Sequence, residues 1–202
     1  MIMLVKRTWH DWLPVVLMVV FAASRWPGLW PESWSSFSAA YALAFCAGVY
    51  FSARLAWWLP LVTLVISDVV LSVFYYKVGP FTVYMVPNYL AYACVIGLGR
   101  AYSPRSSWLN LFCGGLLGAV LFYLITNTNS WLQNPGYSKT LSGWIQALTS
   151  GIPGYPPTWT FFRNTLLSGG LFTGLFVGAM KLTEENEEAE KAVEEAPEPE
   201  AE

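Results

Sequence analysis

Residues 55–76 read LAWWLPLVTLVISDVVLSVFYY, and Asp68 is the only charged residue among them. A hydrocarbon core of about 30 Å needs about 20 helical residues, so this stretch is long enough to cross a membrane. Backbone groups in lipid must be bonded within their own segment, which favours a helix. Five further apolar runs span residues 12–24, 36–52, 81–99, 108–126 and 161–180. We therefore predict an all-α integral membrane protein with six transmembrane helices.

The residues around these runs agree with this interpretation. All eleven tryptophans fall at the end of a predicted span or in a connection, where an indole can bury its ring and hydrate its N–H. Small residues recur every fourth position, which allows helix backbones to approach closely. They are Ala40, Ala44 and Gly48, Gly114 and Gly118, and Gly170, Gly174 and Gly178. We expect these positions to pack helices within the chain or to dock a partner subunit.

Charge divides the chain into two parts. Residues 1–183 hold three acidic residues against ten Lys/Arg, whereas residues 184–202 hold ten acidic residues and one lysine. We predict a transmembrane domain over 1–183 and a disordered acidic tail over 184–202, because the tail has too few apolar residues to form a core. With 55% hydrophobic residues and only 12% charged, the composition argues against a soluble enzyme or a nucleic-acid-binding protein.

The basic residues predict an orientation. If the N-terminus is cytoplasmic, the inner segments carry Lys6, Arg7, Arg54, Arg100, Arg105 and Lys181, and the outer segments carry Arg25, Lys77, Lys139 and Arg163. Lys and Arg are more frequent in cytoplasmic loops, so this count favours cytoplasmic N- and C-termini.

The sequence offers little for metal or nucleophilic chemistry. His10 is the only histidine, and Cys46, Cys94 and Cys113 lie in apolar runs without a CxxC spacing. A zinc site or a serine–histidine pair would have to depend on that single histidine. There is no Gly-rich loop followed by Lys to bind phosphates. We expect neither a metal nor a cofactor, and no enzymatic activity.

Polar residues gather in the outer halves of the predicted spans. Asp68 is the only acidic residue within a span, and charge inside a membrane usually has a function. Arg25, Asn88, Asn127, Arg163 and Asn164 fall at a similar depth, which predicts a small-molecule pocket open to the outside. Other roles remain open for single residues. Asp68 could pair with Arg25 or Arg163, Arg163 could reach the headgroups, and Asn88 could bond across helices.

The connection over residues 127–160 is unusually long and rich in aromatic residues. Within it, Leu141, Trp144, Ile145 and Leu148 follow the spacing of a short amphipathic helix. We predict a lid over the polar cluster, with a passive interfacial helix as the alternative. The candidate substrate-binding residues are Arg25, Asp68, Asn88, Asn127, Trp131, Trp144, Arg163 and Asn164. For a carboxylate or phosphate ligand we expect Arg163, at a helix start, to be the anchor, with Arg25 second.

Several of these positions carry a resemblance to a known family. They are Arg25-Trp26-Pro27, Ser36-Phe37-Ser38, Arg54, Pro60, Ser67-Asp68, Asn127, Trp131 and residues 162–165 (Phe-Arg-Asn-Thr). Over residues 12–180 the chain resembles a bacterial membrane family of unknown function whose members are labelled transport proteins. That family is in turn similar to the substrate-binding S components of energy-coupling-factor (ECF) transporters. One segment departs from its pattern, because Ser36-Phe37-Ser38-Ala39 stands where the family has Asn-Phe-Ser-Pro.

The resemblance implies a six-helix S-component-like bundle in the bacterial cytoplasmic (inner) membrane. It also implies uptake of a small nutrient, a vitamin or another micronutrient, energised by a partner ATPase and transmembrane module. A second hypothesis remains open: a structural or assembly membrane protein whose polar cluster is a buried ion-pair network without a ligand. In either case we expect the bilayer as a partner and no nucleic acid.

Overall fold

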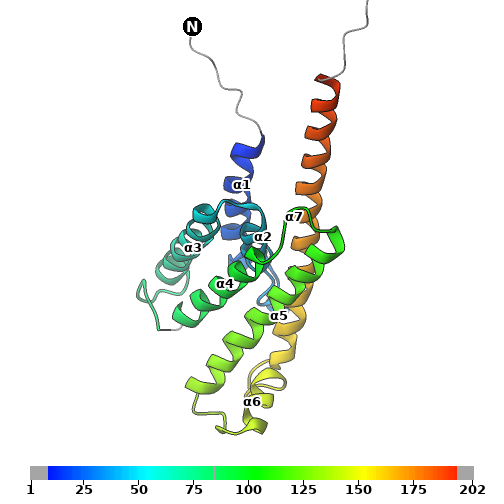
Figure 1. Ribbon diagram of the computed structural model, residues 1–202. Helices are drawn as coiled ribbons and strands as arrows, with labels where there is room; N and C mark the ends of the chain where they lie inside the picture. Colours follow the sequence, from blue (N-terminus) through cyan, green and yellow to red (C-terminus); the bar gives the residue numbers. More distant parts are fainter. Residues whose placement is uncertain (1–8, 84, 195–202) are drawn as a thin grey trace, which may run out of the picture.

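The computed structural model describes residues 9–83 and 85–194, and this part of the chain is all-α, as predicted (Figure 1). Short 3₁₀ turns, η1 (Pro27–Leu29) and η2 (Glu32–Trp34), lie in the first connection, and a π-helical turn, η3 (Leu71–Tyr75), continues the third helix. The α-helices are α1 (Trp9–Ser24), α2 (Ala40–Tyr50), α3 (Ala53–Val70), α4 (Met85–Arg100), α5 (Trp108–Gln133), α6 (Leu141–Leu148) and α7 (Thr158–Glu194).

Three of these helical segments are long and apolar enough to cross a membrane. They are α3 with η3 (Ala53–Tyr75), α5 (Trp108–Gln133) and the first part of α7 (Thr158–Thr183). The other three predicted spans are helical but shorter, with 16 residues each in α1 and α4 and 11 in α2. At 1.5 Å per residue, 16 residues cover only about 24 Å. The described residues therefore confirm three long apolar segments, and the prediction of six spans is not confirmed.

The central helix is α2, and its environment explains why its sequence resembles a membrane span. Its residues from Ala40 to Val49 are all buried, and α2 packs against α1, α3, α4, α5 and α7. A helix that is apolar on every side needs apolar surroundings, and other helices supply them as well as lipid does. The run predicted over residues 36–52 is therefore the core of the bundle.

Close backbone packing holds α2 against α4. A Cβ atom added to Gly48 would lie 2.3 Å from the Ile96 carbonyl oxygen, and one added to Gly99 would lie 2.2 Å from the Phe45 carbonyl oxygen. The predicted packing role is confirmed at Gly48. At Gly178 an added Cβ would have open space around it, so this position packs against no other described helix, and the alternative of a partner contact stays a prediction.

The acidic segment differs from its prediction. Helix α7 continues to Glu194, so residues 184–194 are helical where the sequence predicted disorder. Glu, Ala and Lys are good helix formers, and an existing helix can extend without a new nucleation step. Residues 195–202 of the predicted tail lie outside the described residues.

Helix boundaries also move two predicted site residues. Helix α4 begins at Met85, so Pro87 lies in its first turn, where a missing N–H costs little, and it makes no kink beside Asn88. Helix α5 extends to Gln133, so Asn127 and Trp131 are helical instead of belonging to a connection. The long connection shortens to residues 134–157, within which α6 coincides with the predicted amphipathic helix.

Candidate functional site: a polar cavity at the helix ends

A cavity of about 1000 Å³ lies where several helices end or begin. Its walls come from the C-terminal ends of α1 and α3, the N-terminal ends of α4 and α7, and the middle of α5. In Figure 1 these helix ends lie away from the end of the bundle at which the chain enters and leaves. The cavity therefore lies toward one end of the bundle.

A buried ion pair forms part of the cavity wall. Arg25, directly after α1, donates through Nη2 to Asp68 Oδ1 and through Nη1 to Ser67 Oγ and to the Leu64 carbonyl, the last at 3.4 Å. Asp68 is only 7% exposed. The pairing that the sequence left open between Arg25 and Arg163 is thus made by Arg25, and it joins α1 to α3.

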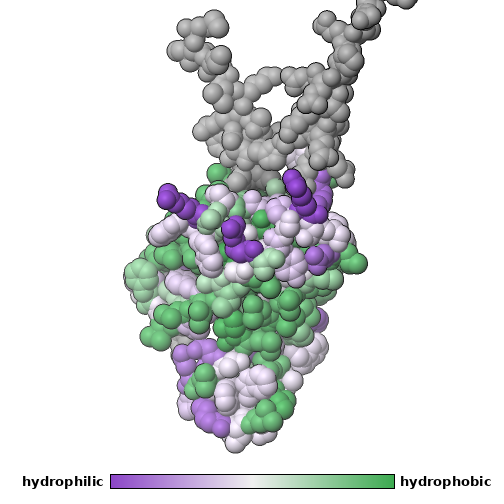
Figure 2. Space-filling view, viewed as in Figure 1, coloured by the Kyte–Doolittle hydropathy of each residue, from purple (hydrophilic) through white to green (hydrophobic). Residues whose placement is uncertain are grey.

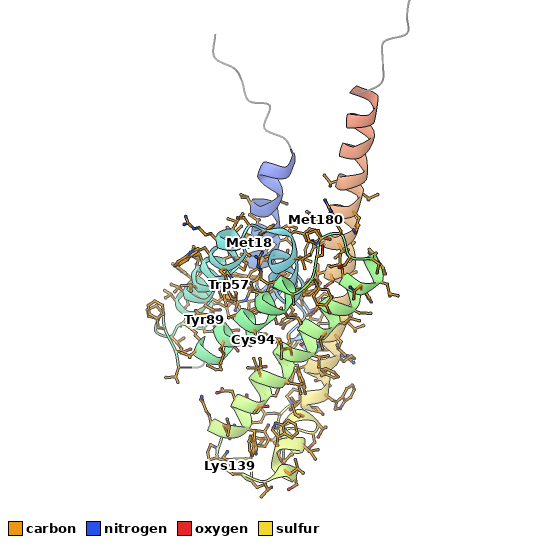
Figure 3. All side chains as sticks on the ribbon, viewed as in Figure 1. Met18, Trp57, Tyr89, Cys94, Lys139 and Met180 are labelled. Carbon is orange, nitrogen blue, oxygen red and sulfur yellow. The ribbon has the colours of Figure 1, made fainter. Side chains whose placement is uncertain are left out.

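Helix α4 reaches the same carboxylate. The Tyr89 hydroxyl interacts electrostatically with Asp68, and both this hydroxyl and Asp68 Oδ2 are buried without any other hydrogen-bond partner among the described residues. Tyr89 lies on α4 where α4 runs beside α3 (Figure 3). One carboxylate therefore connects α1, α3 and α4.

Other polar groups in the cavity wall have free hydrogen-bonding capacity among the described residues. Ser72 is 6% exposed, and within the described residues neither its hydroxyl nor the Asn88 amide makes a hydrogen bond. Asn127 donates through Nδ2 to the Tyr123 carbonyl at 2.9 Å, which leaves its Oδ1 available. The π-helical turn η3 carries Ser72, and its Tyr76 N–H donates to the Leu71 carbonyl, five residues earlier. Such π-turns are frequent at functional sites.

Residues 26–38, which we call the strap, cover the cavity between α1 and α2. Asn164 is 1% exposed and donates through Nδ2 to the carbonyls of Ser33 and Ser35, both at 2.9 Å. At the end of the strap, the Ser38 hydroxyl lies 3.1 Å from that of Ser24. Most strap residues line the cavity: Trp26, Pro27, Trp30, Pro31, Glu32, Trp34, Ser35, Ser36, Phe37 and Ser38.

The predicted lid is wrong, because no residue of α6 lines the cavity. Helix α6 packs against α5 and α7 instead, and the Trp144 indole donates to Thr128 Oγ1 at 2.9 Å. The Trp131 indole likewise donates to the Ser138 carbonyl at 2.8 Å, away from the cavity. The cause is the length of α5, whose extension to Gln133 carries α6 beyond the cavity.

The predicted anion anchor does not lie on the cavity either. Arg163 donates through Nε and Nη2 to Asn164 Oδ1, at 3.1 and 3.0 Å, and its guanidinium lies 5.7 Å from the centre of the Trp159 ring. By occupying Oδ1, Arg163 turns the Nδ2 group of Asn164 toward the strap. Both residues therefore fix the strap, and neither lines the cavity.

The cavity thus brings together four of the eight predicted residues, Arg25, Asp68, Asn88 and Asn127. Sequence reasoning missed Ser72 and Glu32. Ser72 could have been found, because it follows Asp68 by four residues and so shares its helix face. Glu32 offered no such pattern, because it belongs to the strap.

Comparison with known proteins places the chain in a family but gives it no activity. No curated protein and no solved structure matches it. The expected likeness to ECF S components therefore gains no support from these comparisons. A sequence model of DUF6580, a family of unknown function, matches residues 6–192. This match covers nearly the whole chain, and the protein therefore belongs to DUF6580.

Proposed function

We propose that this protein is a membrane subunit that binds a small nutrient in the strap-covered cavity and takes part in its uptake. The observation that carries the proposal is a set of polar groups in the cavity wall that bond to no other described residue: the Ser72 hydroxyl, the Asn88 amide and the Asn127 amide oxygen. Ser72 is buried, and the two asparagines are half-buried. A buried polar group without a partner costs free energy, and a ligand or water can remove that cost.

The size and the mixed character of the cavity support a small-molecule ligand. Ligand pockets typically occupy about 300–1,000 Å³ and combine aromatic walls with a few polar groups. This cavity has about 1000 Å³, and both aromatic and polar residues line it. A bound nutrient could therefore bury most of its surface while the strap covers it.

The transport part of the proposal depends on the resemblance to ECF S components. Such a subunit binds its nutrient and leaves energisation to a partner ATPase and transmembrane module. The long apolar helices α3, α5 and α7 are consistent with a membrane subunit of this type.

The proposed orientation places the cavity on the outer side of the bacterial cytoplasmic membrane, with both termini in the cytoplasm. Basic residues support it, because Arg54, Arg100, Arg105 and Lys181 lie at the other end of the bundle, where Arg100 donates to the Phe51 carbonyl and Lys181 to the Pro104 carbonyl. Figure 2 shows an apolar band between two more polar ends, and Figure 3 shows Lys139 at the end opposite Met180.

Single cysteines should report this orientation. In a variant lacking Cys46, Cys94 and Cys113, we expect a cysteine at Ser138 to react in intact cells with an impermeant maleimide, whereas one at Ser103 should react only after lysis. Both positions are exposed, in connections at opposite ends of the bundle, so burial does not account for a difference. Labelling of Ser103→Cys in intact cells, with Ser138→Cys protected, would reverse the topology.

A second candidate function is a structural or assembly role without a ligand. It is favoured by the Arg25–Asp68 pair, which is complete within the protein and already joins two helices. Under this hypothesis the cavity holds only water.

Native mass spectrometry of the protein released from membranes in mild detergent separates the two functions. We expect the wild type to carry a small-molecule adduct, and Ser72→Leu, which fills the cavity beside the ion pair, to lack it. Ser106→Leu, in the connection between α4 and α5, is the matched control and should retain it. Wild type without an adduct in every preparation, including protein from cells grown in rich medium, would favour the structural role.

A further inference from the structure

We infer that the cavity recognises a ligand that presents a positively charged or N–H-donating nitrogen on an aromatic ring, and that it disfavours carboxylates and phosphates. The inference rests on the proposed function, because it presupposes that the cavity binds a small molecule, and it names the chemical class of that molecule.

The first argument is the charge balance of the cavity. The charged residues that line it, within the described chain, are Arg25, Glu32 and Asp68. Asp68 neutralises Arg25, and the Arg25 guanidinium also donates to Ser67 and Leu64. Glu32 is exposed and forms no ion pair among the described residues. The cavity therefore carries one negative charge in excess, and its low-dielectric walls focus the field of that charge on the ligand.

The second argument is the set of free hydrogen-bonding groups. Asn127 uses one of its two N–H groups on the Tyr123 carbonyl and keeps its amide oxygen available. The Ser72 hydroxyl and the Asn88 amide can each accept and donate, and the Glu32 carboxylate adds an acceptor that carries a negative charge. A carboxylate accepts hydrogen bonds and donates none, so a nitrogen with several N–H groups is its natural complement.

The third argument is the aromatic surface. At the cavity mouth Trp26 meets Tyr75 at 5.9 Å between ring centres, and Tyr75 meets Tyr76 at 5.0 Å. Deeper in, Phe122 lies 4.6 Å from Tyr41 and 4.7 Å from Tyr92. Ring faces attract cations and stack on planar groups. Aromatic walls beside an unpaired carboxylate therefore suit a planar cation.

The same observations argue against anionic ligands. A ligand carboxylate or phosphate would meet the unpaired charge of Glu32, and the only guanidinium among the described lining residues, that of Arg25, is already paired with Asp68. Arg163 donates to Asn164 and to the Ser33 carbonyl, and it does not line the cavity. Like charges brought together in a site of low dielectric repel strongly.

Three probes of one shape test the inference: benzamidine, which is cationic, benzamide, which is neutral, and benzoate, which is anionic. We expect isothermal titration calorimetry on the detergent-purified full chain to show benzamidine binding at least about tenfold more tightly than benzoate, the ratio for one charge-assisted hydrogen bond. The affinity of benzamide should lie between those of benzamidine and benzoate.

Two variants locate the binding. Glu32→Gln should weaken the binding of benzamidine by about fivefold or more and leave the binding of benzamide nearly unchanged, because only the cation loses a charge-assisted hydrogen bond. Ser72→Ala should weaken the binding of both benzamide and benzamidine. Neither side chain bonds to another described residue, so folding should be preserved. Ser106→Ala, in the connection between α4 and α5, makes the same chemical change as Ser72→Ala outside the cavity and should leave the binding of both probes unchanged.

The possible outcomes separate the inference from the proposed function. Benzoate binding as tightly as benzamidine, with Ser72→Ala weakening it, would overturn the inference and leave a small-molecule site. Binding by none of the three at millimolar concentration would contradict both. Titration in nanodiscs separates two sources of an organic ammonium: if phosphatidylethanolamine competes with benzamidine and phosphatidylglycerol does not, the cation site is supported and its natural occupant is a lipid headgroup instead of a nutrient.

Discussion

Asp68→Asn is expected to lower the free energy of unfolding by about 3–5 kcal/mol, the typical cost of leaving one member of a buried ion pair without its partner. Arg25 loses the carboxylate that neutralises it among the described residues, and it cannot reach water easily, because its side chain is only 16% exposed. The asparagine also offers Tyr89 a weaker acceptor. The change should appear as a clearly lower melting temperature of the purified protein in detergent.

Two further variants make this measurement specific. Glu32→Gln makes the same chemical change at an exposed carboxylate that lines the same cavity, and it should melt like the wild type. The double variant Arg25→Met/Asp68→Leu removes both charges and should recover most of the lost stability, since apolar replacements of a buried pair are often neutral. If Asp68→Asn melts like the wild type while benzamidine binding is lost, Asp68 serves the ligand and not the pairing of helices.

Gly99→Ala is expected to destabilise the protein by about 1–3 kcal/mol or more, the range for overpacking a well-packed core. The added methyl group would lie 2.2 Å from the Phe45 carbonyl oxygen and 3.1 Å from Gly48 Cα. These are backbone atoms, so no side chain can rotate away, and α2 and α4 would have to separate. Because α2 contacts most other helices, the separation would disturb the whole core.

Gly178→Ala provides the matched control for this experiment, because it makes the same substitution in α7 where an added Cβ meets nothing within 4 Å. It should be neutral or stabilising, by up to about 1 kcal/mol, from helix propensity alone. Thermal unfolding followed by circular dichroism compares the two. Equal melting temperatures for Gly99→Ala and Gly178→Ala would contradict the close approach of α2 and α4.

The positions of the helices could be predicted, because apolar runs mark the segments that leave water. Whether protein or lipid surrounds each helix could not be predicted. The runs of α2 and α3 are similarly apolar in sequence, yet protein encloses α2, whereas α3 exposes Trp58, Val62 and Ile66. An apolar side chain gains free energy by leaving water, whether lipid or protein replaces the water. Hydropathy alone therefore does not distinguish a helix enclosed by protein from a helix that faces lipid.

The candidate site was likewise predictable from the sequence only in part. Arg25, Asp68, Asn88 and Asn127 could be found because a polar residue in an apolar run is conspicuous, and the helices bring them to one cavity. The roles of Arg163, Asn164 and Trp144 could not be found, because they depend on where α5 ends and on what covers the cavity. The strap has no periodic pattern, and its place over the cavity is seen only in the folded chain, where hydrogen bonds to Ser24 and Asn164 hold it.

The enclosure of α2 has a consequence for biogenesis. Of the helices packed around it, only α1 precedes it in the chain; α3, α4, α5 and α7 are synthesised afterwards. An 11-residue helix covers about 16 Å at 1.5 Å per residue, too little to span the bilayer by itself. The protein surroundings of α2 are therefore complete only after α7 has been synthesised.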